Sequence, residues 1–381
     1  MNKREISEIK KQFKKDNNAI TRICGCYVDA EKNIRTTLKE AFFALSEEEI
    51  FKYYEIFKKT LSGGIGKNLH NLEYSIRDEG EDSAHALLMK LREEKLADDE
   101  TVDSFYNKVI ENYDYGENYY IILIHSAYDV PGKASDNEEM FDASEEVYHH
   151  ILCCICPVKL SEPGLSYNEA TNLIEERPRD WWVQPPMTGF LFPAFDDRAT
   201  NLYGALYYTK NTDNSYEEFV SAVFNLQPPM PAGTQRETFR EVLTDALEDE
   251  CSVNVVQNVH TALRELVLTH KETRAEEPLA VTRQEVGAVL EHCGVSEPKM
   301  AAFNVKYDEA FGGGSEVPPQ NLLGAAQLEY RTPDVVIRVN PDRQDLVQTR
   351  VLGGAKYLLI NVDEGMELNG VSVRVPEEQK D

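Results

Sequence analysis

The sequence has no long apolar segment and few cysteines. Its longest uninterrupted apolar runs fall far short of the roughly 20 residues that a membrane-spanning helix needs. Met1-Asn2-Lys3-Arg4 leads into charged residues and not into the apolar core of a signal peptide, so we expect no secretion signal. Seven cysteines among 381 residues are sparse and odd in number, which is typical of a reduced compartment. These absences predict a cytoplasmic protein with no membrane partner.

Recognised catalytic signatures are also missing. The chain has neither a Gly-x-Ser-x-Gly elbow nor a His-Glu-x-x-His pair. The run 63–68, Gly-Gly-Ile-Gly-Lys-Asn, looks like a phosphate-binding loop at a glance. A P-loop needs an earlier glycine and a Ser or Thr after the lysine, and Leu61 and Asn68 stand at those positions. We therefore expect no cofactor, and a binding protein rather than an enzyme.

Charge is abundant but unevenly spread. The net charge is −27, yet residues 1–70 carry 14 basic against 10 acidic groups, whereas residues 71–150 carry 6 against 21. A strongly acidic body opposes general affinity for nucleic acid or acidic membranes. The mildly basic beginning is compatible with a local anionic contact.

Residues 3–15 are predicted to form an amphipathic helix. Ile6, Ile9 and Phe13 share one stripe at helical spacing. The basic residues of the other side are Lys3, Arg4, Lys10, Lys11, Lys14 and Lys15. Two interpretations stay open: an arm for an anionic partner, or the solvated face of a helix docked through its apolar stripe.

Four apolar runs, at 119–124, 151–158, 189–195 and 202–208, have the length and composition of strands, and the last two predict a hairpin. Between the first two runs, the acidic stretch 136–146 is expected to be a loop with a short helix. Ser166-Tyr167-Asn168-Glu169 predicts a capped helix between the second and third runs.

Helices and turns organise the rest of the chain. Ser46 and Glu49 form a predicted capping box, as do Thr282 and Glu285, and Asn369-Gly370 predicts a tight hairpin. The Pro-rich run 227–233 is the predicted boundary. We expect an α+β fold: an antiparallel or mixed sheet with flanking helices over 1–226, the linker 227–233, helices over 234–330, and β-hairpins over 331–381.

Two clusters of cysteines are compatible with either a metal site or packing in the core. Cys24 and Cys26 would share a strand face, as would Cys154 and Cys156, so paired strands could bring four thiolates together. Buried cysteine also packs simply as a small apolar residue, and this is the interpretation we favour.

Other polar and aromatic groups are candidates for a site. His125, Ser126 and Asp129 have the residue types of a triad, but neighbouring strand residues point to opposite faces. The pair Trp181-Trp182 could form a recognition surface or plug the end of the sheet. The turn 196–198 has a carboxylate pair beside an arginine, which turn chemistry already explains. The candidate binding residues are Lys10, Lys11, Lys14, Lys15, Trp181, Trp182, Asp196, Asp197 and Arg198.

With these elements identified, the chain resembles an uncharacterised bacterial family described as a domain of unknown function. The hairpin 189–211, the segment 281–307 and the tail 332–371 carry this resemblance. The order of parts is also similar to that of the bacterial nucleoid-associated protein family that includes the spermidine-nucleoid protein. That similarity lies in an opening strand near Ile20, a Tyr-Tyr-Ile-Ile-Leu-Ile strand and a terminal β segment. It implies a role in nucleic-acid binding.

The leading hypothesis is therefore a non-enzymatic cytoplasmic binding protein with a nucleoid-associated role, whose partner is nucleic acid or protein. The alternative is an enzyme of unrecognised type with a site near Trp181-Trp182 and the turn 196–198. A phage-linked or stress-linked interaction module is a third hypothesis, and no sequence feature separates it from the first. The oligomeric state is left open.

Overall fold

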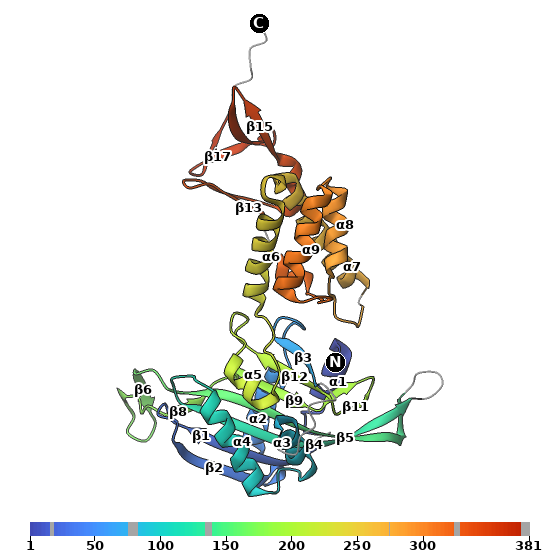
Figure 1. Ribbon diagram of the computed structural model, residues 1–381. Helices are drawn as coiled ribbons and strands as arrows, with labels where there is room; N and C mark the ends of the chain where they lie inside the picture. The colour runs from blue at the N-terminus through green and yellow to red at the C-terminus, as the bar shows by residue number, and fades with distance from the viewer. Residues whose placement is uncertain (16–18, 75–82, 134–138, 274, 324–327, 375–381) are drawn as a thin grey trace. The chain divides into compact units, whose positions relative to one another are not determined.

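The computed structural model describes residues 1–15, 19–74, 83–133, 139–273, 275–323 and 328–374. The chain divides into two compact units: Met1–Gln235 with Arg274–Leu279, and Arg236–Thr273 with Ala280–Asp381. Both contain helices and strands, and the protein is of the α+β class (Figure 1).

The first unit is built on one large sheet. In chain order its described elements are α1 (Lys3–Lys10), β1 (Ile20–Val28), β2 (Ile34–Ala41), the 3₁₀ helix η1 (Phe42–Ala44), α2 (Glu47–Thr60), β3 (Leu69–Glu73), α3 (Ala84–Glu93), α4 (Asp99–Asn112), β4 (Tyr119–Lys133), β5 (Glu139–Leu160), β6 (Leu165–Asn168), β7 (Leu173–Glu176), β8 (Trp181–Val183), β9 (Thr188–Phe192), β10 (Ala194–Asp196), β11 (Ala199–Asn201), β12 (Gly204–Thr209) and α5 (Glu217–Phe224). The strand order is β2-β1-β4-β5-β9-β12-β3, with β8 paired to β5 as the eighth strand. All its pairings are antiparallel.

The central strands are buried on both faces, because side chains alternate along a strand and each face has its own helices. Residues of α3, α4 and α5 pack with Leu123 and Cys153 on one face. Residues of α1 and α2 pack with Ile124 and Cys154 on the other. The helices therefore form layers on both sides of the sheet, which explains why its strands are apolar runs without strict alternation.

The predicted strand runs are confirmed, and β9 and β12 pair as the expected hairpin. Two predictions in the same region are wrong. Residues 139–146 continue β5 and do not form a loop with a short helix, because their backbone pairs with the far end of β4; residues 136–138 lie outside the described part. Ser166-Tyr167-Asn168-Glu169 does not open a helix either. Leu165–Asn168 pairs with Leu173–Glu176 as a hairpin.

The second unit combines a helical core with small hairpins. Its elements are most of α6 (Ala232–Leu247), the 3₁₀ helix η3 (Glu248–Glu250), α7 (Val253–Thr273), α8 (Arg283–His292), α9 (Glu297–Phe311), α10 (Pro319–Leu322), β13 (Leu328–Arg331), β14 (Val336–Val339), η4 (Pro341–Leu346), β15 (Val347–Leu352), β16 (Ala355–Ile360), β17 (Met366–Leu368) and β18 (Val371–Val373). Phe239, Val259, Leu290 and Phe303 are among its buried core residues. The capping box of Thr282 and the hairpin at Asn369-Gly370 form as predicted.

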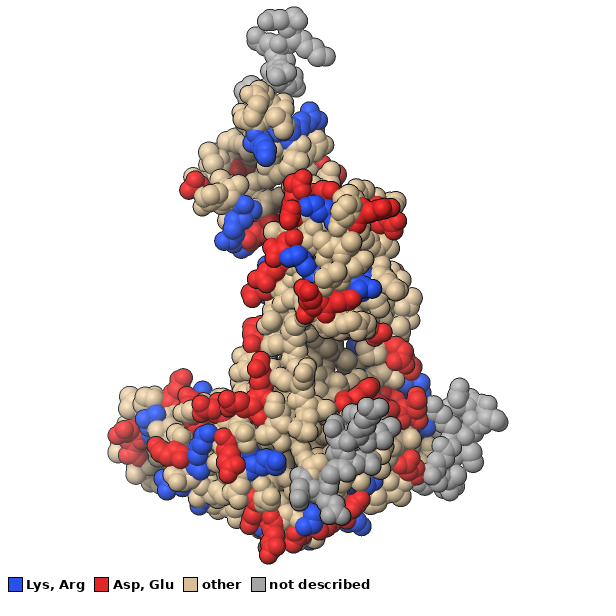
Figure 2. Space-filling view, viewed as in Figure 1, with Lys and Arg blue, Asp and Glu red and all other residues tan. Residues whose placement is uncertain are grey.

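Among the described residues, no helix has the combination of length and apolar composition that a bilayer crossing requires. On the face shown in Figure 2, acidic and basic side chains are interspersed over both units. On this face the charged side chains are therefore not confined to one unit (Figure 2).

Candidate functional site

Helix α1 presents three sides that are used in three different ways, because successive helical residues are about 100° apart. Ile6 and Ile9 are buried on the sheet, together with Phe13 just beyond the helix. Glu5 and Glu8 fall to one side of this stripe, whereas Lys3 and Lys10 fall to the other. The acidic side and the lysine side are therefore separated by the helix itself.

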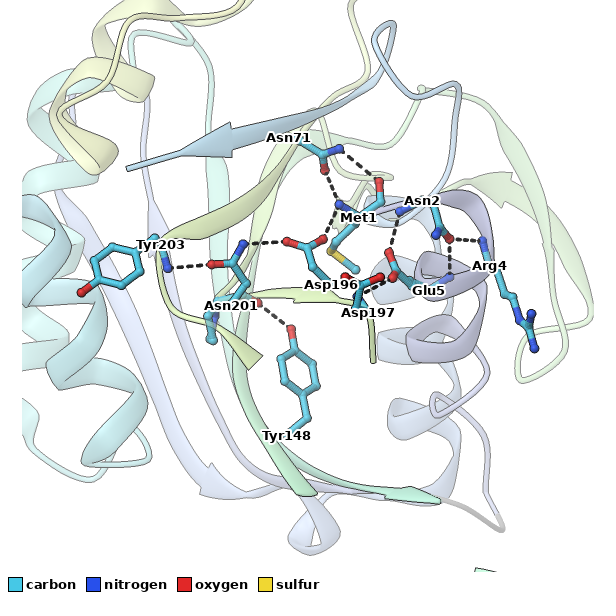
Figure 3. Close-up of polar contacts among 11 residues, drawn as sticks. Met1, Asn2, Arg4, Glu5, Asn71, Tyr148, Asp196, Asp197, Asn201 and Tyr203 are labelled. Atoms are coloured by element: carbon cyan, nitrogen blue, oxygen red, sulfur yellow. Dashed lines mark hydrogen bonds and ion pairs between the residues drawn. The ribbon is translucent and has the colours of Figure 1, made fainter. Parts of the chain in front are cut away.

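The acidic side is docked on the turn between β10 and β11 (Figure 3). One oxygen of the buried Glu5 carboxylate accepts the backbone N–H of Asn2 at 2.7 Å, and the other accepts that of Asp197 at 2.8 Å. The Glu8 carboxylate lies 3.1 Å from Nη2 of Arg198 and also accepts the Tyr128 hydroxyl at 3.0 Å. These two glutamates fix α1 to the turn.

Asp196 faces the first residue of the chain. Its Oδ1 lies 2.5 Å from the amino group of Met1, and its Oδ2 accepts the side-chain amide of Asn201 at 2.7 Å. Asn71 on β3 accepts from the same amino group and donates to the Met1 carbonyl, both at 3.1 Å (Figure 3). Of the predicted site residues, Asp196 and Arg198 are thus engaged through their side chains by groups of the chain itself, whereas Asp197 is engaged through its backbone N–H and has an exposed side chain.

The lysine side borders a pocket of about 200 Å³. Lys3, Ser7 and Lys10 contribute from α1, and the loop after α2 contributes Ser62 and Gly63. The remaining lining is apolar, from Ile6, Leu61, Ile65 and Leu69. A rim of ammonium and hydroxyl groups over an apolar floor suits an anionic group attached to a less polar body.

Among the described residues, the charges that act on Lys10 are those of two other lysines. Its Nζ donates to Ser62 Oγ at 2.5 Å. Partial burial, and then the charges of Lys59 and Lys58 in the last turn of α2, lower the pKa of Lys10 below its ordinary value. An ammonium ion in this position is stabilised by any anion that enters the pocket.

Six lysines make up what we call the lysine surface: Lys3, Lys10, Lys11, Lys14, Lys58 and Lys59. Lys11 and Lys14 follow α1 directly and are exposed. Within the described part of the chain, none of the six forms an ion pair with an acidic side chain. Their charge is therefore available to a partner, although 67 acidic residues are present in the chain.

The structure divides the predicted basic helix. Helix α1 ends at Lys10 and not at residue 15, so Lys11, Lys14 and Lys15 lie in the following turns and not on one helical face. Lys15 forms an ion pair with Glu47 at the start of α2, so Lys15 is not part of the lysine surface. Lys10, Lys11 and Lys14 are the predicted lysines that belong to the lysine surface.

Lys58 and Lys59 were missed by sequence reasoning. They lie in the last turn of α2, where basic residues commonly interact with the free carbonyls of a helix end, so they carried no distinguishing signal. Their proximity to Lys10 depends on the packing of α1 beside α2, which includes the ring contact of Phe13 with Phe57 at 5.4 Å.

Trp181 and Trp182 lie on β8 and are 56% and 53% exposed, so they do not plug the end of the sheet. Trp181 pairs with Leu160 at one end of β5, whereas the β10–β11 turn meets β5 at Glu146, through Thr200. Fourteen residues of extended strand span roughly 46 Å. The structure therefore does not bring the tryptophans and the 196–198 turn into one site.

The histidines of the sheet also form no triad. Ser126 lies opposite His150 on β5, and His125 lies on the other face, where it contacts His149 (ring centroids 5.4 Å apart) and the hydroxyl of Thr21 (2.7 Å). Burial lowers the pKa of His125 to about 4 and that of His150 to about 3, which keeps both rings neutral near pH 7.

The five cysteines of the sheet are buried in the core, which is the interpretation favoured from the sequence. Cys24 and Cys26 lie in the core of one sheet face, and Cys154 and Cys156 in that of the other, so the four thiols cannot meet at one ion. Burial raises the pKa of Cys24 to about 11 and that of Cys26 to about 12. Within the described ranges, no three His, Cys, Asp or Glu side chains are placed to hold a metal ion.

The loop 63–68 follows α2 and leads into β3, so it does not open a helix as a P-loop would. The backbone N–H groups of Lys67, Asn68 and Leu69 all donate to the carbonyl of Gly64 and are not turned toward a ligand. The loop contributes to the pocket through Gly63 and Ile65, and it is not a phosphate cradle.

Comparison with curated proteins finds no match, and comparison with solved structures finds none either. A family model, described as a domain of unknown function (DUF4317), matches residues 1–371. The match covers both compact units and almost the whole chain, and so this protein belongs to the DUF4317 family.

Proposed function

We propose that this protein is a non-enzymatic cytoplasmic binding protein that takes an anionic partner on its lysine surface, and that the partner is nucleic acid. The observation that carries the proposal is the set of six lysines that have no acidic partner among the described residues; Lys3 and Lys10 line the α1 pocket, and Lys58 and Lys59 act on Lys10. Unpaired cations at close range repel one another, and a phosphate backbone would relieve that repulsion. The resemblance to nucleoid-associated proteins that the sequence suggests is the reason for choosing nucleic acid among anionic partners.

The acidic body shapes how such a partner would bind. Outside residues 1–70 the remaining 311 residues carry −31, since residues 1–70 carry +4 of the total of −27. A polyanion is repelled at long range and is attracted only where the lysines are close, so we expect contact over a short stretch. Four to six phosphate contacts predict a slope of roughly −4 to −5 in log K against log salt concentration.

Binding of labelled duplex DNA, followed by gel shift and by fluorescence anisotropy at low salt, tests the proposal. The variant Lys10→Glu/Lys58→Glu/Lys59→Glu is expected to weaken binding by about 100-fold or more. The matched control, Lys52→Glu/Lys159→Glu/Lys306→Glu, changes the net charge equally at lysines that already face acids, and it should bind within about threefold of the wild type.

Two results would remove the proposal. One is the absence of any DNA binding by the wild-type protein at low salt. The other is equal loss of binding in both triple variants, because that would reflect net charge and not the lysine surface.

A further inference from the structure

Seven large apolar side chains are exposed within a short segment of the first unit. We call residues 161–183, which contain β6, β7 and β8, the arm. The seven side chains are 39–76% exposed: Leu165, Tyr167, Leu173, Ile174, Trp181, Trp182 and Val183. Single exposed apolar residues are ordinary, but a concentration of this kind, rich in aromatics, marks an interaction surface.

The arm is fixed at its base. Two hydrogen bonds join Ser161 to Asp180. The Ser161 N–H donates to the Asp180 carbonyl at 2.9 Å, and the Ser161 hydroxyl accepts the Asp180 N–H at 3.1 Å. Arg179 Nε donates to the Ser161 carbonyl at 2.8 Å, and Arg177 N–H donates to the Gly164 carbonyl at 2.8 Å. Because these contacts set the direction of the arm before any partner arrives, binding costs less ordering entropy.

The hairpin of the arm is apolar on one face and mostly polar on the other, where Ser166, Asn168 and Glu175 lie with Leu173. Tyr167 pairs with Ile174 across β6 and β7, and Leu165 points to the same side, whereas Leu173 points to the other side with Asn168. An isolated two-stranded ribbon is marginal in water, so a covering surface would stabilise it. The exposed apolar face suits an arm that lies against a second molecule.

We propose that the arm mediates self-association, with the arm of one copy packed against the arm of a second copy of this chain. With roughly 200 Å² for each large apolar side chain, Leu165, Tyr167 and Ile174 on the apolar face, which are 76%, 56% and 64% exposed, offer on the order of 400 Å². This is about one partner's share of a small, transient interface. In a two-fold contact the same patch meets itself, so its charges must be of both signs.

The charges of the arm meet that condition. They are Glu162, Glu169, Glu175, Glu176, Asp180, Arg177 and Arg179, which lets the arginines of one copy lie opposite the acids of the other. The excess of acids makes the arm unsuitable for nucleic acid. The self-association is therefore independent of the proposed anion binding, and it is expected in the absence of DNA.

Sedimentation velocity of the full-length chain, without nucleic acid, tests this inference. The wild-type protein should sediment as a dimer at tens of micromolar, and Leu165→Glu/Ile174→Glu should raise the dimer dissociation constant by about 100-fold or more. The change is at exposed positions, so far-UV circular dichroism should stay as in the wild type. Val351→Glu, an exposed valine on another hairpin, is the matched control and should dimerise normally.

Trp181→Ala/Trp182→Ala provides a second variant without added charge, and it should also weaken the dimer. The inference would be overturned if the wild-type protein stayed monomeric at 100 µM, a concentration roughly ten times the dissociation midpoint expected for a transient interface. A dimer that survives both arm variants, or that dissociates in Val351→Glu alone, would overturn it as well.

Discussion

The two polar sides of α1 carry opposite charges, and only one of them is paired within the described residues. On the acidic side, Glu5 and Glu8 are satisfied by the β10–β11 turn and by Tyr128, and they hold the helix in place. On the other side, Lys3 and Lys10 border a pocket and face no acid within the described residues. Charges that pair inside the chain build the fold, and charges left unpaired are available for a partner.

The buried stripe of α1 holds both polar sides of the helix in position. Ile9→Ala removes a fully buried side chain that packs α1 on the sheet. We expect the free energy of unfolding to fall by about 3 kcal/mol, as for other large-to-small core changes. DNA binding should fall too, because Lys3 and Lys10 would no longer be held at the pocket. Urea unfolding measured by circular dichroism checks the loss of stability, and Ile34→Ala, at an exposed position, is the control. A loss of stability with unchanged DNA binding would contradict the expectation that the packing of α1 positions Lys3 and Lys10.

Arg198→Ala tests the acidic side alone. The change leaves the Glu8 carboxylate without its guanidinium and the Pro131 carbonyl without its 3.0 Å donor, and both members of the ion pair are less than one-fifth exposed. We expect a loss of about 2 kcal/mol in unfolding free energy. Lys52→Ala, which removes an exposed pair with Glu55, should cost at most about 0.5 kcal/mol. Equal costs for the two variants would show that the docking contact is no stronger than a surface ion pair.

Acid pH probes the sheet beneath α1. The folded-state pKa of His150 is lowered to about 3 by burial, whereas the unfolded chain has an ordinary histidine pKa near 6.5. As pH falls below about 6.5 the unfolded state takes up a proton that the folded state does not, so stability is full above that pH and is lost toward acid at up to about 1.4 kcal/mol per pH unit. His150→Leu should reduce this slope between pH 6.5 and 5, measured by urea unfolding at each pH. An unchanged slope would show that His150 titrates alike in both states.

Alkaline pH probes the lysine side and should have the smallest effect. The pKa of Lys10 is lowered by burial and by Lys59 and Lys58, so Lys10 loses its charge at a lower pH than an ordinary lysine side chain. Its contribution to DNA binding is present below the lowered pKa and is lost above it. Lys10→Arg keeps the charge at high pH, and it should bind DNA up to about tenfold more tightly than the wild type at pH 10 while matching it at pH 7. The same pH profile for both proteins would place Lys10 outside the contact.

The sequence correctly predicted helices and hairpins whose ends are determined by residues close to them in the chain. The capping box of Ser46 and Glu49 begins α2, and Asn369-Gly370 makes its hairpin. The strand at 139–146 was missed because its cause is the distant end of β4, which pairs with an acidic stretch regardless of its low strand propensity. The hairpin at 165–176 was missed because the Ser166 box was taken as a helix start, although Leu173-Ile174 after it favours strand.

The candidate site was predictable in composition and not in arrangement. The sequence shows that Lys10, Lys11 and Lys14 are basic and near the start, and these three belong to the lysine surface. It does not show that the side chains of Asp196 and Arg198 meet Met1 and Glu8, or that the backbone N–H of Asp197 meets Glu5, because a charged turn has the same composition whether its partner is solvent or another element. Which charges remain unpaired is decided by tertiary packing.

The salt dependence of DNA binding tests the central claim most directly. Anisotropy titrations of one duplex should be carried out at several salt concentrations with the wild type, Lys10→Glu/Lys58→Glu/Lys59→Glu and Lys52→Glu/Lys159→Glu/Lys306→Glu. The lysine-surface variant should flatten the slope of log K against log salt by about 3, at roughly 0.9 for each lost phosphate contact, and the control should keep the wild-type slope. Parallel lines for all three proteins would contradict the claim that the lysines of α1 and α2 make the contact.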